Sequence, residues 1–479
     1  MDTNDNLRDF LTIPYDELET LNLKAKKRAL KREPISKVRK YYSDYLKAEK
    51  RIKAVTICFT DIEGRFHMLD YDKKFFLDSY MSLTFDGSSV RGFASLEKSD
   101  LAVTPDWYSF RWLPSDVFGQ GKVLMFGYIV DQHGDLYESD MRSRLHSYLD
   151  DLYKKKKIDV NISSEIEGVI VRDKRAEQNY DEKDGFKLVT EGGYFHALPT
   201  DKLKQFIDKS AEAQRVLGFE NEKDHPEVAP SSFELNFKYT DALLACDQIQ
   251  LYKLVCRQVA HNMSLTATFL PKPVVGINGN GMHINISLAK AGKNLFYSKG
   301  GELGLSALAW SFTSKILNHA NGLCLILNAS VNAYRRLDPN YEAPNQIRHS
   351  ATDRGAMIRI PLANNNSTRL EIRSVGPDAN PYLAVYSLIK TGFEGEDLVR
   401  DKNKRPRMRI LPGTITDAIR YFKGSGFVTE LLGEEVKTKY LKRKEAVAHR
   451  SARELGSKIK NGEILYHHEV TNQLLWKKF

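Results

Sequence analysis

Four short segments alternate polar and apolar residues with a period of two, and this pattern constrains the fold more than any other feature. The segments are SSEIEGVIV at 163–171, FELNFKY at 233–239, MHINISL at 282–288 and RLEIR at 369–373. Successive side chains of a β-strand point to opposite faces, so each segment predicts a strand with one polar and one apolar face. Any one of them alone reads as an amphipathic strand with a solvated face. Together they repeat Glu, His and Arg rather than Lys, Thr and Ser, which predicts one sheet face that carries a chemical site.

The residue types on that face indicate metal and phosphate chemistry. Carboxylates predominate and are joined by one imidazole, that of His283. Such a hard, mostly oxygen donor set suits Mg²⁺ or Mn²⁺, whereas zinc sites use more Cys and His. The neighbouring Arg369 and Arg373 can grip phosphate oxygens with two hydrogen bonds each. Carboxylate-held metals beside arginines are what phosphoryl transfer from ATP requires, although the chain has no GxxxxGK[ST] loop and no kinase signature set.

The order of predicted elements indicates an α+β fold. Residues 1–45 predict a partly helical N-terminal extension broken at Pro34, and residues 46–137 predict a small β-rich domain. Residues 138–479 predict a large domain that opens with a helix at 138–153, capped by Ser139 or Asp140, and is mainly helical from 414 onward.

Charge and cysteine content limit which classes of protein this chain can belong to. The net charge is +10, and residues 24–40 hold nine Lys or Arg against one Glu. Basic arms can bind nucleic acid, but no finger, zipper or RNA-binding aromatic motif accompanies this one, so we expect a solvated helical face or a subunit contact instead. The four cysteines lack metal or redox spacing, which favours a reducing, cytoplasmic setting. No apolar run reaches the roughly 20 residues of a membrane helix, and no signal peptide is expected.

Several separated motifs make the chain resemble the glutamine synthetase family from about Ala54 to about residue 395. In order they are FDGSS at 85–89, EIE at 165–167, GGYF at 192–195, HPEVAP at 225–230 with Glu234, ATFLPKP at 267–273, NGNGMH at 278–283, NAYRRLDPNYEAP at 332–344, DRGAMIRIP at 353–361, RLEIRS at 369–374 and NPYLA at 380–384. The resemblance implies a small β-grasp-like N-terminal domain and a large catalytic domain, in which a curved antiparallel sheet flanked by helices carries the metal site.

The resemblance also implies a role for each matching residue. The ligands of a first metal would be Glu167, Glu227 and Glu234, and those of a second metal Glu165, His283 and Glu371. Glutamate would be held by Asn278, Gly279, Arg336 and Arg373, and the nucleotide by Asn285, Ser287, Arg354 and Arg359. Ammonium would be bound by Asp86, Ser89, Tyr194 and Glu227, and catalysis would use Asp86, Arg354, Arg359 and the flap residue Glu342.

The implied reaction is the ATP-dependent ligation of ammonia to L-glutamate through γ-glutamyl phosphate, with two or more Mg²⁺ or Mn²⁺ ions per site. The implied assembly is a dodecamer of two hexameric rings with active sites between subunits. One alternative is a relative that joins glutamate to a polyamine or another amine; the retained Asp86, Tyr194 and Glu342 favour ammonia. Another alternative, a catalytically inactive relative, is disfavoured because all six metal-ligand positions are kept.

Three departures from the family pattern stand out. Asn285 occupies a position where many members have a second histidine near the nucleotide, and Ser231-Ser232 replaces a common Gly-Gln. Residues 397–413 contain no tyrosine, so the regulatory nucleotidylation of some bacterial members is not expected.

Overall fold

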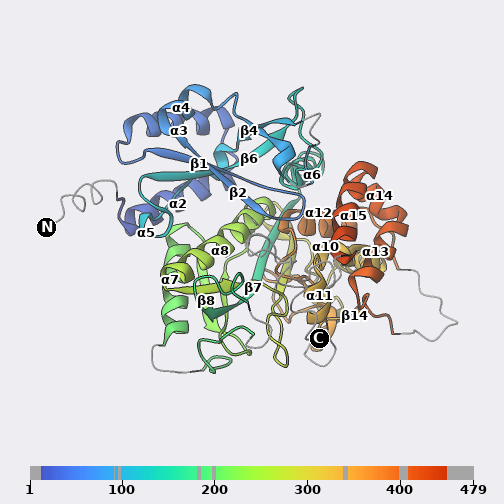
Figure 1. Cartoon of the computed structure of the whole chain (residues 1–479). Coiled ribbons are helices and arrows are strands. Elements are labelled where there is room, and N and C mark those ends of the chain that lie inside the picture. Colours follow the sequence, from blue (N-terminus) through green and yellow to red (C-terminus); the bar gives the residue numbers. More distant parts are fainter. Residues whose placement is uncertain are drawn as a thin grey trace.

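The computed structural model describes residues 12–90, 92–94, 99–180, 185–196, 201–337, 343–398 and 408–449. It forms a small domain built on one sheet and a larger domain built on another, with a group of C-terminal helices beside the larger sheet (Figure 1). This is the α+β fold that the sequence pattern predicts.

The small domain contains a six-stranded sheet with the strand order β2-β1-β6-β4-β3, to which β5 is added beside β6. Its strands are β1 (Ala54–Thr60), β2 (Phe66–Asp72), β3 (Thr84–Asp86), β4 (Asp100–Pro105), β5 (Arg111–Trp112) and β6 (Lys122–Val130). The central pair, β1 and β6, runs parallel, and the other pairs are antiparallel. Short helices α4 (Lys73–Ser79) and α5 (Ser115–Phe118) and the 3₁₀ turns η1 (Gly87–Ser89) and η3 (Trp107–Ser109) connect them.

Two helices precede this sheet, α2 (Tyr15–Leu30) and α3 (Ile35–Ala48), and the chain turns between them just before Pro34, the N-cap of α3. Their apolar faces join the core of the small domain, where the Tyr42 and Phe110 rings stack with centroids 4.3 Å apart. The buried Asn22 amide donates to the carbonyl of Trp112 at 2.9 Å and to that of Val216 at 2.7 Å. Helix α2 is therefore fixed to both domains.

The large domain is built on a ten-stranded sheet with the order β14-β15-β16-β12-β7-β9-β8. Its strands are β7 (Asp159–Arg172), β8 (Asn221–Pro226), β9 (Ser232–Phe237), β10 (Thr240–Asp241), β11 (Leu265–Thr268), β12 (Met282–Lys290), β13 (Lys293–Asn294), β14 (Gln346–Ser350), β15 (Ala356–Arg359) and β16 (Leu370–Ile372). All its pairs are antiparallel except β14 with β15. The four alternating segments of the sequence form β7, β9, β12 and β16, so these strand predictions are confirmed.

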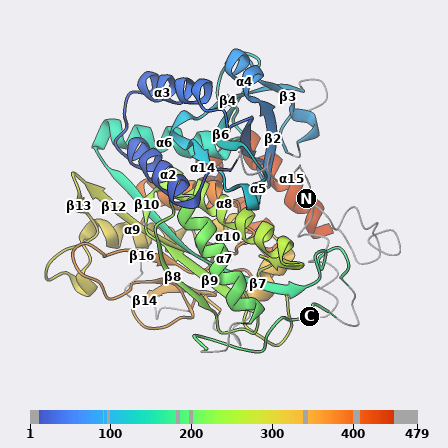
Figure 2. The same cartoon turned by 90° about the vertical axis from the view of Figure 1, so that its left-hand side faces the viewer.

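Helices cover the apolar face of the large sheet (Figure 2). The helices that contact this sheet directly include α6 (Met141–Lys156), α7 (Lys202–Val216) and α8 (Ala242–Asn262), and α9 (Ala307–Asn318) contacts β14. The remaining helices of the large domain are α10 (Ala320–Leu327), α11 (Val331–Arg336), α12 (Pro381–Glu394), α13 (Ile415–Gly424), α14 (Gly426–Leu432) and α15 (Glu434–His449), with a 3₁₀ turn η4 (Glu302–Gly304). Helix α6 is capped by Asp140, whose side chain accepts from the backbone N–H of Arg142. No helix in the described ranges is long and apolar enough to cross a membrane.

A buried ion network joins the two domains. Arg142 on α6 contacts Asp106 of the small domain at 2.7 Å and Asp247 on α8 at 2.8 Å, and the Tyr382 hydroxyl donates to Asp247 at 2.7 Å. The Arg142 side chain is 1% exposed, so its charge is compensated almost entirely by these partners. A second buried contact pairs Glu63, in the loop after β1, with Arg443 at 3.0 Å and Lys444 at 2.9 Å on α15.

Candidate active site

Strand pairing brings the predicted metal ligands together although they are far apart in the sequence. His283 on β12 lies opposite Glu165 on β7, and Glu167 on β7 lies opposite Glu234 on β9. Glu371 on β16 lies opposite Asn285 on β12. Because side chains two residues apart share a face, these groups point to the same side of the sheet.

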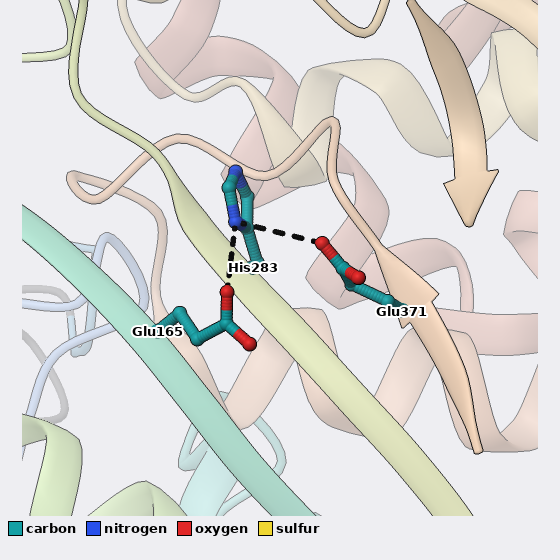
Figure 3. A group of neighbouring side chains, drawn as sticks. All are labelled: Glu165, His283 and Glu371. Carbon is teal, nitrogen blue, oxygen red and sulfur yellow. Dashed lines mark hydrogen bonds and ion pairs between the residues drawn. The ribbon is translucent and has the colours of Figure 1, made fainter. Parts of the chain in front are cut away.

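Glu165, His283 and Glu371 form one cluster (Figure 3). His283 Nδ1 lies 3.4 Å from a Glu165 carboxylate oxygen and 3.8 Å from one of Glu371. One potential ligand atom of each residue lies within 4.8 Å of those of the other two. The structure therefore gathers the three side chains that the resemblance assigns to the second metal.

A second cluster consists of His225, Glu227 and Glu234, whose potential ligand atoms also lie within 4.8 Å of one another. His225 Nε2 is 3.7 Å from Glu234, and its Nδ1 is 3.7 Å from Glu227. His225 was not among the residues predicted from the sequence. Its position in HPE, two residues before Glu227, was the signal that could have identified it.

Glu167, predicted to belong with Glu227 and Glu234, lies between the two clusters. One of its oxygens is 3.9 Å from His283 Nε2, and the other accepts a 2.6 Å hydrogen bond from the backbone N–H of Gly281. A side chain at Gly281 would place its Cβ 2.6 Å from Arg336 Nη2 and 2.7 Å from His283 Nε2. Glycine is therefore required here for the close approach of three functional groups.

The clusters hold an excess of negative charge. Burial, reinforced by the neighbouring Glu167 carboxylate, raises the pKa of Glu227 to about 7 and that of Glu234 to about 9. Burial acts in the same direction on Glu165, but the hydrogen bonds with His283 and Asn285 and the positive charges of His283 and Arg369 together outweigh it and lower the pKa of Glu165. Buried carboxylates that repel one another, with imidazole nitrogens among them, fit a pair of hard divalent cations.

Arginines surround the carboxylates. Arg359 contacts one oxygen of the buried Glu371 at 2.8 Å, and Arg373 contacts the other at 3.4 Å. Arg336 donates to the carbonyl of Arg373 at 2.9 Å, while its Nη1 atom is buried without a hydrogen-bond partner in the described chain. Burial lowers the pKa of Arg336 to about 10. An unpartnered, buried guanidinium nitrogen is a donor suited to an anionic ligand.

All these groups line one pocket of about 320 Å³. Its lining includes most of the predicted site residues, namely Glu165, Glu167, Tyr194, Glu227, Glu234, Asn278, Gly279, His283, Arg336, Arg354, Arg359, Glu371 and Arg373. It also includes His225, which was not predicted, and Arg369, which the strand pattern suggested as a phosphate contact but to which the family resemblance gave no role.

Other predicted residues lie elsewhere. Asp86 is exposed at the end of β3 in the small domain, where its carboxylate accepts hydrogen bonds from Ser88 and Ser89, and neither Asp86 nor Ser89 is part of the pocket lining. Asn285 and Ser287 follow His283 along β12 but do not line the described pocket. Glu342 lies outside the described residues.

Comparison with known proteins agrees with this geometry. Residues 51–132 match the family model of the glutamine synthetase beta-Grasp domain, and residues 138–458 match that of the glutamine synthetase catalytic domain. A glutamine synthetase of Staphylococcus aureus (strain MRSA252) is 33% identical over 419 residues, covering 83% of this chain and 91% of the relative.

Two solved structures have the same fold. Plasmodium falciparum glutamine synthetase aligns with a TM-score of 0.76 and 22% identity, covering 89% of this chain and 98% of that one. A GmaS complex with ADP aligns with a TM-score of 0.73 and 25% identity, covering 87% and 99%. With both family models matched in order and the catalytic face assembled as described, the chain belongs to the glutamine synthetase family and is a ligase.

Proposed function

We propose that the protein makes glutamine by joining ammonia to the side-chain carboxylate of L-glutamate, with ATP converting that carboxylate to γ-glutamyl phosphate. Glutamine, ADP and phosphate are the products. The observation that carries the proposal is the single pocket in which two carboxylate–histidine clusters face several arginines. A carboxylate is a poor electrophile until it is phosphorylated, and this combination of groups is the one that phosphoryl transfer needs.

Two divalent cations, Mg²⁺ or Mn²⁺, are part of the proposal. Glu167, Glu227 and Glu234, with His225 beside them, would hold one, and Glu165, His283 and Glu371 would hold the other. When bound, the cations would neutralise charge on the nucleotide phosphates. The raised pKa values of Glu227 and Glu234 support this assignment, because these carboxylates need a positive partner in order to ionise near neutral pH.

Arginines would bind the substrates. Arg336 and Arg373, with Asn278 and the backbone of Gly279, would hold glutamate, and the unpartnered Nη1 of Arg336 supports that role. Arg354 and Arg359 would face the phosphate in transfer. The ADP bound to the similar protein GmaS supports a nucleotide site in this fold.

Ammonium would be bound by Asp86 and Ser89 together with Tyr194 and Glu227, and Glu342 would accept its proton and shield the acyl phosphate from water. Asp86 is exposed on the small domain and absent from the pocket lining of its own chain. This supports a site completed by the Asp86 of a neighbouring subunit, in a dodecamer of two hexameric rings.

Phosphate release from ATP and glutamate tests the proposal, with ammonia compared against putrescine and ethanolamine. We expect ammonia to give the highest kcat/KM and glutamine to be the product. If ammonia is ignored and an amine is used, the chain is an amine ligase of the same family. Asp86→Ala should impair the use of ammonia far more than the binding of ATP.

A further inference from the structure

We propose that two asparagines, Asn236 and Asn285, are positioning residues that each orient one of the two metal-ligand clusters independently of the other. This inference rests on the proposed metal-dependent function. Both side chains are almost fully buried, at 6% and 3% exposure. Each asparagine lies two residues after a cluster member on the same strand, Asn236 after Glu234 on β9 and Asn285 after His283 on β12. The period of the strand therefore directs each amide to the face that carries the clusters.

Asn236 serves the cluster of His225, Glu227 and Glu234. Its Nδ2 donates to one oxygen of Glu234 at 2.9 Å, while its Oδ1 is buried without a hydrogen-bond partner in the described part of the chain. A buried amide oxygen left unpaired is costly, and turning the amide over would set that oxygen against the Glu234 carboxylate. The amide is thus held with its donor toward Glu234 Oε1, the oxygen that lies 3.7 Å from His225 Nε2, and it fixes the orientation of the carboxylate in the cluster.

Asn285 serves the cluster of Glu165, His283 and Glu371. Its Nδ2 donates to Glu165 Oε1 at 3.1 Å, and its Oδ1 accepts from Arg369 Nε at 2.9 Å. The other oxygen of Glu165, Oε2, is the one that faces His283 at 3.4 Å. A neutral amide can donate to a carboxylate and accept from a guanidinium at the same time. Asn285 therefore fixes the position of the Glu165 carboxylate relative to the guanidinium of the pocket residue Arg369.

The two amides act on separate carboxylates from separate strands. In the sheet, β12 and β9 lie on opposite sides of β7. The hydrogen bonds of Asn236 reach Glu234 and those of Asn285 reach Glu165 and Arg369, so neither amide touches the ligand held by the other. Groups that orient metal ligands in this way typically change metal affinity by about 10- to 100-fold when they are lost.

The test measures Mn²⁺ binding to the full chain without nucleotide, by electron paramagnetic resonance of free Mn²⁺ and by calorimetry. Glu371→Gln disables the cluster of Glu165, His283 and Glu371, so Mn²⁺ binding to this variant reports on the other cluster. Glu227→Gln disables the cluster that contains His225 and Glu234, so binding to that variant reports on the first. Each background then receives Asn236→Leu or Asn285→Leu, because leucine keeps the approximate shape of asparagine and removes its donor. Asn236→Ala and Asn285→Ala replace any leucine variant that does not fold.

In the Glu371→Gln background, we expect Asn236→Leu to weaken Mn²⁺ binding about 10- to 100-fold and Asn285→Leu to leave it unchanged. In the Glu227→Gln background we expect the reverse: Asn285→Leu should weaken Mn²⁺ binding about 10- to 100-fold and Asn236→Leu should leave it unchanged. The matched control is Asn221→Leu. Asn221 donates at 3.1 Å to Asp224, a carboxylate outside the pocket lining, so its loss should lower thermal stability without changing Mn²⁺ affinity.

Equal effects of both asparagine variants on both sites, or no effect on either, would overturn the inference. Because the readout is metal binding, a wild-type chain that binds Mn²⁺ but makes no glutamine would refute the proposed reaction and leave the positioning roles intact. A wild-type chain that binds no Mn²⁺ would overturn both proposals.

Discussion

Glu167 on β7 lies directly opposite Glu234 on β9, and both carboxylates line the same pocket. Burial and the like charge of Glu167 disfavour ionisation of Glu234, so the metal-free fold keeps this carboxyl protonated at a free-energy cost near neutral pH. We therefore predict that Glu234→Gln raises the free energy of unfolding of the metal-free protein by up to about 1 kcal/mol. The same variant should lose most of the stabilisation that Mn²⁺ gives to the wild type. Thermal unfolding in chelator and in Mn²⁺ measures both effects, and a Glu234→Gln protein that is less stable than wild type in chelator would contradict the prediction.

The carboxyls of Glu227 and Glu234 predict a pH dependence of stability. The pKa of Glu227 is raised to about 7 and that of Glu234 to about 9, from ordinary values of 4.5. Between pH 4.5 and 9 these two carboxyls therefore bind more protons in the folded, metal-free chain than in the unfolded chain, and their contribution to stability falls as the pH rises through this window. The stability advantage of Glu234→Gln in chelator should accordingly grow from pH 5 to pH 9, as buffered thermal unfolding can show. An advantage that stays constant with pH would exclude this linkage.

Glu371 should be indispensable for turnover. Its buried carboxylate belongs to the cluster with Glu165 and His283 and contacts both Arg359 and Arg373. Glu371→Ala should abolish glutamine formation, because it removes a proposed metal ligand and the anion that orients two arginines. Excess chelator should abolish the activity of the wild type as well. Undiminished activity under chelation would rule out the metal-dependent mechanism.

Mixing two inactive variants tests whether sites are shared between subunits. Asp86→Ala removes a group of the small domain, and Arg359→Ala removes one from the pocket. If each site takes Asp86 from one subunit and Arg359 from the next, random mixing in equal amounts leaves about one quarter of the junctions intact. We expect about that share of wild-type activity after the two are refolded together. Each variant refolded alone is the control, and a mixture without recovered activity, together with a monomeric mass, would refute sharing.

The contact between Glu63 and α15 should stabilise the fold. Burial opposes ionisation of Glu63, but Lys444 and Arg443 outweigh it and hold its pKa far below 4.5. This contribution is therefore fully present above about pH 4.5 and lost only in stronger acid. Glu63→Gln should reduce the free energy of unfolding at pH 7 by about 3 kcal/mol, because it removes the carboxylate that the buried Lys444 ammonium contacts. Asp417→Asn, which breaks the exposed pair with Arg420, is the control and should cost no more than about 1 kcal/mol.

The sequence predicted the strands of the site better than their arrangement. Period-two alternation identified β7, β9, β12 and β16, because it is a local property of the chain. The pairing of His283 with Glu165, 118 residues earlier, depends on contacts across the whole sheet. The family resemblance supplied that grouping instead.

The residues that escaped prediction share a physical reason. His225 stands on β8 beside Pro226, in a short segment whose neighbours do not alternate clearly. Asn236 was not predicted, and Asn285 was predicted as a nucleotide contact. Both are neutral amides, and whether such a group contacts a ligand or orients its neighbours depends on which carboxylate it reaches. The contact of Asn285 with Glu165 exists only after β7 and β12 have paired.

The Asp106–Arg142–Asp247 network also limits how the two domains can move relative to one another. Swinging the small domain away from the large one would separate Arg142 from Asp106 and leave buried charges uncompensated, which costs several kcal/mol. The two domains then move as one rigid body, which carries both Asp86, at the end of β3, and the large sheet with the metal-ligand clusters. Any opening motion within the chain that admits substrates must therefore come from the loops around the pocket.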